Sequence, residues 1–183
     1  PTSPKTPAKQ PLQMVCLLDG HGESGLIALK DAVMRCPKAL LGLTVIDSSR
    51  PAHHQSTQQW NGCSITWLGA MDQAAFSSLL QSQAVWIEPT LVGGDDPALA
   101  KEVLSAGLWM LATDRSAAAD VIQAGRNGEV ISSTEHSNWS RALLQLCRQR
   151  PNSQPLMQFP KLEPSLTEQL EQLHQRISLH KSS

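Results

Sequence analysis

The chain has 183 residues, of which 17% are charged and 40% are hydrophobic, and its formal net charge is −1. This length suits one domain with its own core, and the hydrophobic content excludes disorder throughout the chain. The near-zero net charge argues against general polyanion binding, so we expect neither nucleic acid nor an anionic membrane as a partner. No stretch approaches the roughly 18 apolar residues that a membrane-spanning helix needs.

The N-terminal segment is rich in proline, threonine and lysine, and this composition predicts a flexible linker over residues 1–11. The segment lacks an initiator methionine and the apolar stretch of a secretory signal peptide, so we expect a fragment or a processed product in the cytoplasm. The four cysteines are widely spaced and include no C-x-x-C motif: Cys16, Cys36, Cys63 and Cys147. Such spacing favours reduced thiols over a zinc site.

Short apolar runs alternate with helical patterns from residue 12 to residue 150. Continuous apolar runs, typical of strands buried on both faces, predict strands at 14–18, 40–46, 64–68, 84–88, 108–113 and 129–131. Apolar residues at helical spacing, with capping and stop signals, predict helices at 23–35, 73–82, 97–106, 116–124 and 137–148. Polar residues with proline and glycine predict a loop over 48–62.

This alternation predicts an α/β fold, namely a Rossmann-like doubly wound parallel sheet of about six strands with helices on both faces. We assign this domain to residues 12–150. Residues 151–183 begin with a proline-rich stretch and continue with an apolar stripe at helical spacing, so we expect a linker and a C-terminal helix there. Sheets of this class bind ligands beyond the carboxyl ends of their strands, so the loops after the strands are the candidate site.

The first of these loops, Gly20-His21-Gly22-Glu23-Ser24-Gly25, is a literal G-x-G-x-x-G motif between a predicted strand and a predicted helix. In that context, backbone amides and the helix N-terminus hold a pyrophosphate. Asp47 ends the second predicted strand, where a ribose-binding carboxylate would lie. One interpretation is therefore an NAD-binding Rossmann domain that uses residues 20–25. The other is a tight strand–helix turn, because Glu23 is unfavourable beside a phosphate.

The loop before the helix at 97–106 is the second candidate. Gly93 and Gly94 allow the backbone to approach a ligand closely. Asp95 and Asp96 lie at the start of the helix, where carboxylates also act as ordinary caps. No metal site is expected, because the histidines lack the spacing of metal ligands, and no G-x-S-x-G motif supports hydrolase chemistry.

A series of short motifs begins at the end of the third predicted strand and continues along the chain in a fixed order. They are Trp67-Leu68-Gly69, Met71-Asp72, Glu88-Pro89-Thr90, Gly93-Gly94, Lys101-Glu102-Val103-Leu104-Ser105-Ala106-Gly107, and the block from Ala119 to Ile131 with its Gly125-Arg126-Asn127-Gly128 turn. In this order they resemble the C-terminal, donor-binding domain of retaining GT-B glycosyltransferases of family 4. The last block is the most specific. With the first strand–helix unit, the resemblance covers about residues 12–150.

The resemblance implies a nucleotide-sugar site at the carboxyl ends of the strands and sugar transfer with retained configuration. Glu102 matches the second Glu of the family's paired-glutamate motif and would bind the ribose of the sugar donor. The position of the first Glu is Gly94, and Asp95 or Asp96 would take its place. The donor site would also include Gly20, His21, Gly22, Gly69, Ala70 and Gly93, whereas no catalytic residue is identified.

The resemblance also implies a partner. Family acceptor groups lie on an N-terminal domain, so we expect this chain to be the nucleotide-sugar-binding half of a larger enzyme, inactive alone and needing no further cofactor. The family's Arg and Lys that neutralise the diphosphate have no match, because Asp19, His21 and Glu23 stand in that region. A degenerate α/β interaction module that binds no nucleotide is therefore the remaining alternative.

Overall fold

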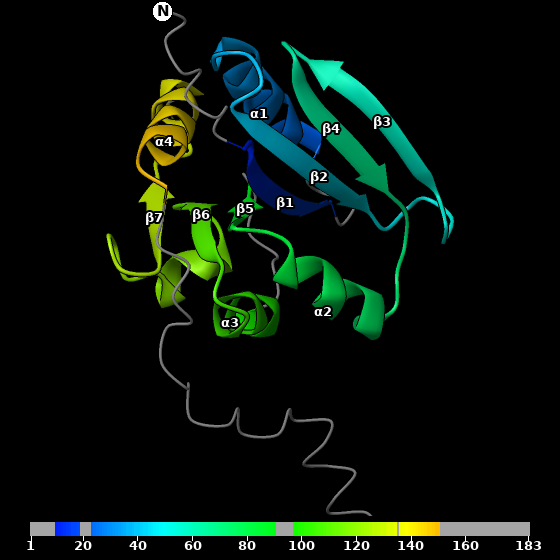
Figure 1. The fold of residues 1–183 in the computed structure, drawn as a ribbon. Coiled ribbons are helices and arrows are strands. Elements are labelled where there is room, and N and C mark those ends of the chain that lie inside the picture. The colour runs from blue at the N-terminus through cyan, green and yellow to red at the C-terminus, as the bar shows by residue number, and fades with distance from the viewer. Residues whose placement is uncertain (1–9, 19–22, 91–96, 135, 151–183) are drawn as a thin grey trace, which may run out of the picture.

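The computed structural model describes residues 10–18, 23–90, 97–134 and 136–150. Within them, one sheet of seven strands, in the order β3-β4-β2-β1-β5-β6-β7, lies between two layers of helices (Figure 1). The strands are β1 (Leu12–Leu18), β2 (Leu41–Asp47), β3 (Gln55–Trp60), β4 (Cys63–Leu68), β5 (Val85–Glu88), β6 (Trp109–Thr113) and β7 (Gly128–Ile131). The helices are α1 (Glu23–Arg35), α2 (Gln73–Gln81), α3 (Pro97–Ser105), α4 (His136–Arg148) and the short 3-10 helix η1 (Ala117–Val121).

The predicted fold class is confirmed. All neighbouring strands except β3 and β4 pair in parallel, and β1 lies between β2 and β5. Chain order therefore reverses at the gap between β1 and β5, the switch point at which such sheets bind ligands. The predicted helix at 116–124 is the shorter η1. Residues 1–9 of the predicted N-terminal linker, and the linker and C-terminal helix expected within 151–183, lie outside the described residues and stay predictions.

The predicted loop over 48–62 is wrong in its second half. There Gln55–Trp60 forms β3, antiparallel to β4, so the sheet has seven strands instead of about six. Trp60 pairs with Cys63 across Asn61 and Gly62, whose φ angles are both positive, at 49° and 77°. An Asn-Gly pair is the strongest short-range signal for such a two-residue hairpin. The strand was missed because all its residues before Trp60 are exposed and polar, which leaves no apolar pattern.

The hairpin is attached to the helix layer through its turn. The Nδ2 of Asn61 donates hydrogen bonds to the backbone oxygens of Met34, at 3.0 Å, and Cys36, at 2.8 Å. Carbonyls at the end of a helix have no partner within the helix, so Asn61 satisfies the end of α1. Trp60, the buried residue of β3, packs edge-on against Trp67 with 6.5 Å between ring centroids.

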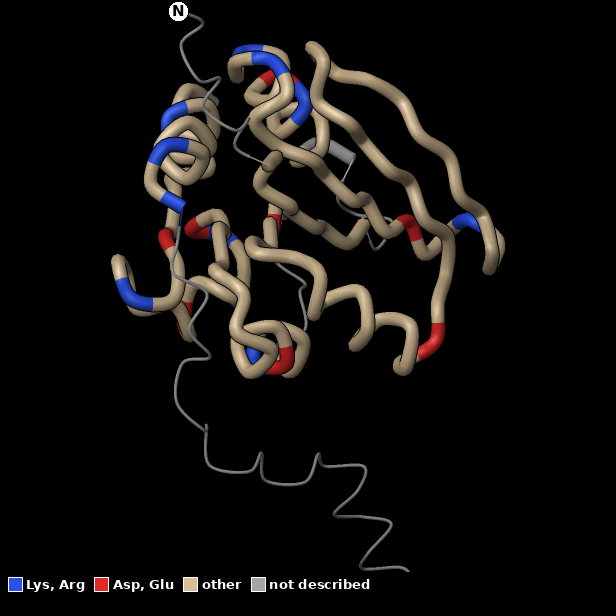
Figure 2. Tube along the Cα trace, in the orientation of Figure 1, with Lys and Arg blue, Asp and Glu red and all other residues tan. Residues whose placement is uncertain are grey.

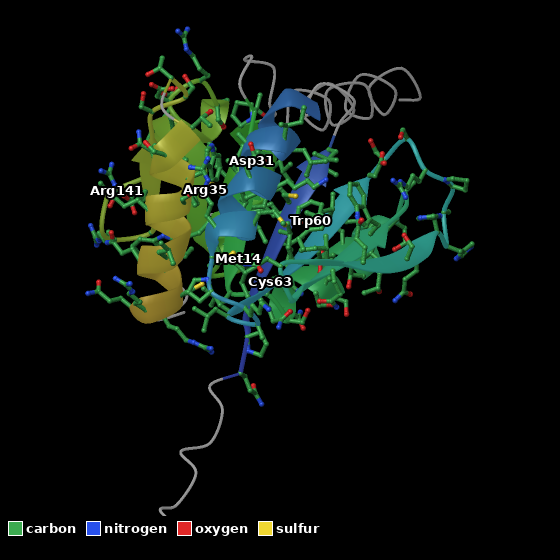
Figure 3. The ribbon with its side chains drawn as sticks, turned by 90° about the horizontal axis from the view of Figure 1, so that it is seen from above. Met14, Asp31, Arg35, Trp60, Cys63 and Arg141 are labelled. Atoms are coloured by element: carbon green, nitrogen blue, oxygen red, sulfur yellow. The ribbon has the colours of Figure 1, made fainter. Side chains whose placement is uncertain are left out.

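Apolar side chains cover the sheet on both faces. One layer packs against α1 and α4 and includes Met14, Leu29, Leu43, Ile65, Trp139 and Leu143. The other packs against α2 and α3 and includes Val15, Leu80, Trp86, Val103, Leu104 and Met110. Successive residues of one strand point into opposite layers, which is why the strands are continuously apolar in sequence. Figure 3 looks down on the first layer, where α1 and α4 lie side by side.

The four cysteines are buried and form no disulfide bonds. Burial, with smaller contributions from the neighbouring Cys147 and Cys63 thiols, raises the pKa of Cys36 to about 12. A thiol that stays protonated is a poor nucleophile and a poor metal ligand, so Cys36 acts as a small apolar group. Among the described residues, no His, Cys, Asp and Glu side chains are grouped in threes or more to hold a metal ion. No described helix has the length and apolar character to cross a membrane.

Replacing Asn61 with alanine should destabilise the protein. The change removes both hydrogen bonds to the end of α1 and leaves a residue less tolerant of positive φ in the turn. We expect the free energy of unfolding, measured by urea denaturation, to fall by about 1–3 kcal/mol. Gln59→Ala, at an exposed position of β3, is the control and should cost less than about 0.5 kcal/mol. Equal losses in the two variants would contradict a stabilising role for the turn.

Candidate functional site

The candidate site is the edge of the sheet where the parallel strands end, called here the carboxyl edge. Its centre is the switch point between β1 and β5. Among the predicted site residues, Gly69, Ala70 and Glu102 are described. The others lie outside the described residues: Gly20, His21, Gly22, Gly93, Gly94, Asp95 and Asp96. The described part of the candidate site consists of residues that flank these two loops and of those that follow β2, β4 and β6.

The segments after β1 and β5 meet through a close backbone contact. A Cβ built on Gly25, in the first turns of α1, would lie 1.8 Å from the carbonyl oxygen of Pro89. Only a glycine allows the helix to approach the strand end this closely, which is the packing role of the last glycine in a G-x-G-x-x-G motif. This role holds whatever the loop binds, so Gly25 does not distinguish an NAD site from another nucleotide site.

The end of β5 carries a buried carboxylate that was not predicted as a site residue. Glu88 is 7% exposed; its Oε1 accepts a hydrogen bond from the Thr90 hydroxyl at 2.7 Å, and its Oε2 accepts one from Trp86 Nε1 at 3.3 Å. Thr113, at the end of β6, donates its hydroxyl to the backbone oxygen of Thr90. Burial, and secondarily the charge of Glu88, raises the pKa of Cys16 in β1.

This network fixes the chain just before the loop that contains Gly93 and Gly94. A buried carboxylate destabilises the fold unless hydrogen-bond donors contact it, so Glu88 keeps its bonds to Trp86 and Thr90. Thr90 is thus held between the ends of β5 and β6, by Glu88 on one side and Thr113 on the other. In the sequence, Glu88 is a single acidic residue at the end of an apolar run. This pattern also fits an exposed strand end, so it does not by itself identify a buried carboxylate.

Gly69 and Ala70, which follow β4, are packed against the turn after β2. The Gly69 N–H donates to the His54 carbonyl at 2.9 Å, and the Ala70 N–H donates to the Arg50 carbonyl at 3.2 Å. A Cβ on Gly69 would lie 1.9 Å from the carbonyl oxygen of Pro51. Both N–H groups are thus already bonded within the chain, and a role for these residues in ligand binding stays a prediction.

The carboxylate of Asp47, at the end of β2, stabilises the same turn through bonds to Ser49 and Arg50. Its Oδ1 accepts from the backbone N–H of Ser49, at 3.1 Å, and from the Ser49 hydroxyl, at 2.6 Å, while its Oδ2 is paired with Arg50 Nε at 2.7 Å. Burial acts to raise the pKa of Asp47, but the bonds from Ser49 and Arg50 and the charge of Arg50 outweigh it and lower the pKa. Because both carboxylate oxygens are engaged, Asp47 is poorly placed to bind the ribose of NAD.

Glu102 lies in α3 and is bonded to the start of α2. Gln73 donates a hydrogen bond from its Nε2 to Glu102 Oε1 at 2.5 Å. Gln73 is the first residue of α2 and follows the N-cap Asp72, whose Oδ1 accepts from Ala75 N at 2.8 Å. Since α2 begins shortly after β4, this bond connects Glu102 to the segment that contains Ala70. Nothing in the sequence pointed to Gln73, because its partner lies far along the chain.

Positive charge at the carboxyl edge is sparse. Along the backbone trace, acidic and basic residues are interspersed among the described residues (Figure 2). Arg50, after β2, is paired with Asp47 and stacks on Trp67, with its guanidinium 4.6 Å from the ring centroid. Arg115, after β6, is exposed. Hydrogen bonds from Ser133, and secondarily the charge of Arg115, lower the pKa of the neighbouring Asp114. Arg115 is a cation at this edge that sequence reasoning did not select.

No protein-family model and no curated protein matches this chain. Its structure is similar to WaaG, a glycosyltransferase involved in lipopolysaccharide biosynthesis, with a TM-score of 0.61 and 17% identity over 79% of this chain and 40% of that one. The catalytic domain of starch synthase IV from Arabidopsis thaliana, bound to ADP and acarbose, matches with a TM-score of 0.60 and 12% identity over 93% and 39%. A UDP-forming α,α-trehalose-phosphate synthase from Burkholderia vietnamiensis matches with a TM-score of 0.58 and 12% identity over 78% and 38%.

These similarities confirm the resemblance at the level of the fold. The chain has the fold of one Rossmann-like domain of GT-B glycosyltransferases. The match covers 40% of the WaaG chain, 39% of the starch synthase IV chain and 38% of the trehalose-phosphate synthase chain. This chain therefore spans about two fifths of the length of each of these three structures.

Replacing Gly25 with alanine should destabilise the fold, although alanine is the better helix former. The added Cβ would overlap the Pro89 carbonyl, so α1 or the end of β5 must move. We expect the free energy of unfolding to fall by about 1–3 kcal/mol in urea denaturation. Gly42→Ala is the matched control, because its Cβ would meet the side chain of Gln13, which can turn away. An unchanged or more stable Gly25 variant would show that the contact is not tight.

The lowered pKa of Asp47 predicts a pH-dependent contribution to stability. Because the folded-state pKa lies below the ordinary 3.8, ionised Asp47 stabilises the fold above about pH 4 and loses this effect as the pH falls through the folded-state value. Asp47→Asn should therefore lower Tm at pH 7, and its difference from the parent should shrink by pH 3. Asp31→Asn, at an exposed position of α1, is the control and should change Tm little at either pH. A Tm difference that stays constant with pH would contradict this account.

Proposed function

We propose that this chain is the sugar-donor half of a glycosyltransferase, a domain that binds a nucleoside diphosphate sugar at the carboxyl edge. The observation that carries the proposal is the position of Glu102 within a GT-B-like fold. It is the match to the second Glu of the family motif, and it is bonded to the segment that follows β4. Starch synthase IV bound to ADP and the UDP-forming synthase support a nucleoside diphosphate as the class of ligand.

The proposed role of Glu102 is to hold the ribose. A carboxylate offers only acceptors, and each ribose hydroxyl offers an O–H donor. Hydrogen bonds to a charged group contribute about 1.5–3 kcal/mol each, more than those between neutral groups. Gln73 occupies one lone pair of Glu102 Oε1, and Oε2 has no partner among the described residues. Glu102 can therefore accept a ligand hydroxyl without losing its bond to Gln73.

The diphosphate is the most strongly charged part of the proposed ligand and needs the most electrostatic stabilisation. During transfer, the bond between the anomeric carbon and the phosphate oxygen breaks and the acceptor oxygen bonds to that carbon. The proton of the acceptor hydroxyl passes to the departing diphosphate. Negative charge grows on the departing diphosphate and needs N–H groups or cations around it. We assign this role to the positive end of the α3 helix dipole and to the cation Arg115. The acceptor site and the catalytic groups are proposed to come from a further domain, so this chain alone should transfer no sugar.

A thermal-shift titration of the chain with UDP, GDP, ADP, their sugar conjugates and NAD tests this function. A ligand that binds only the folded state raises Tm, and a concentration of 100 Kd adds about 2.7 kcal/mol of stability. We expect one nucleoside diphosphate to raise Tm. Glu102→Ala should weaken its binding at least about tenfold, equivalent to about 1.4 kcal/mol. Glu129→Ala, on edge strand β7, is the control and should leave the affinity unchanged.

Other outcomes would favour the alternatives. A shift with NAD alone, weakened by Asp47→Ala, would indicate a dinucleotide site at residues 20–25. No shift with any of these ligands, in a chain that unfolds cooperatively, would indicate a degenerate α/β module. Detectable sugar transfer by the chain alone would refute the proposed need for a second domain.

A further inference from the structure

The bond between Gln73 and Glu102 joins two helices that the chain does not place together. Gln73 opens α2 and Glu102 lies within α3, 29 positions apart in sequence, yet their side chains are 2.5 Å apart between Nε2 and Oε1. Both side chains are long, and holding two such side chains in one geometry at the surface costs rotamer entropy. Such a bond persists only where the two backbones are themselves held in place.

Both backbones are held. Asp72 caps α2, with its carbonyl accepting from Phe76 N at 3.0 Å, and Phe76 packs edge-on against Trp86 at 6.0 Å between ring centroids. In α3, the residue after Glu102 is Val103, which is fully buried against the sheet. The two ends of the Gln73–Glu102 bond are therefore fixed by the core.

The bonded pair has acceptor oxygens left over. Glu102 Oε2 and Gln73 Oε1 accept no hydrogen bond from the described residues, and the two side chains lie next to each other. The ribose of a nucleotide carries two adjacent hydroxyls, each able to donate one hydrogen bond. Two acceptor oxygens held close together match that pair of donors, whereas a 2′-deoxyribose would leave one of them without a donor.

We infer that Gln73 both positions Glu102 and supplies the second acceptor of the ribose site, and thereby gives the site its preference for ribonucleotides over 2′-deoxyribonucleotides. This inference rests on the proposed nucleotide site. Gln73 fixes a flexible carboxylate before the ligand arrives, so less rotamer freedom is lost on binding. Its own Oε1 then accepts from the second ribose hydroxyl, next to the one bound by Glu102 Oε2.

Isothermal titration of the full chain with UDP, GDP and ADP, each beside its 2′-deoxy form, tests the inference. The variant is Gln73→Met, which keeps the length of the side chain and removes its polar atoms. We expect affinity for the ribonucleotide to fall about three- to tenfold, as freeing one long side chain predicts. Affinity for the 2′-deoxy form should change less than about twofold, since that ligand lacks the second hydroxyl. Gln81→Met, at an exposed position in the last turn of α2, is the matched control and should bind both forms like the parent.

The other possible results would overturn either the role of Gln73 alone or the proposed nucleotide site as well. Equal weakening of both forms would show that Gln73 supports the fold of α2 and not ribose recognition, and a Tm measured for each variant would record that loss. No effect of Gln73→Met, with weakening by Glu102→Ala, would overturn the inference alone. No nucleotide binding by the parent, or no effect of Glu102→Ala, would overturn the proposed function together with it.

Discussion

Burial of β1 on both faces is the constraint on which the rest of the structure depends. Met14 is 1% exposed and packs against α1 and α4, and Val15 is 0% exposed and packs against α2 and α3. A strand covered on both sides is joined to its parallel neighbours by crossovers that return the chain over one face. All the parallel strands therefore end at one edge of the sheet. The segments that follow these strands lie together at that edge, because the packed core fixes where each strand ends.

Carboxylates at that edge fall into two kinds. Glu88 and Asp47 use both carboxylate oxygens for bonds within the chain, to Trp86 and Thr90 in one case and to Ser49 and Arg50 in the other. Their bonds hold the ends of β5 and β2 in place. Glu102 accepts one bond, from Gln73, and its other oxygen has no partner among the described residues. This difference, more than acidity or position in the sequence, separates a structural carboxylate from a candidate ligand-binding one.

The proposed function fits this division of labour. A domain with one oriented carboxylate and few cations can recognise the neutral ribose, while the charge of a departing diphosphate calls for more stabilisation than the described residues supply. The chain spans about two fifths of the GT-B enzymes that it resembles in fold, at 40% and 39% of WaaG and starch synthase IV. In the proposal, the acceptor site and the catalytic groups belong to a further domain.

The sequence by itself determined the parallel strands, because buried strands leave continuous apolar runs and amphipathic helices leave a stripe. It also led to Glu102, through a resemblance carried by short motifs. Strand β3 was not predicted, because an exposed edge strand has no apolar pattern. Its position is fixed by its hydrogen bonds to β4 and by the turn at Asn61 and Gly62. The network around Glu88 and the bond from Gln73 to Glu102 were decided only by tertiary structure. Apolar periodicity records which face of an element is buried, but the pairing of polar side chains depends on distances between elements, and only the packed core sets those.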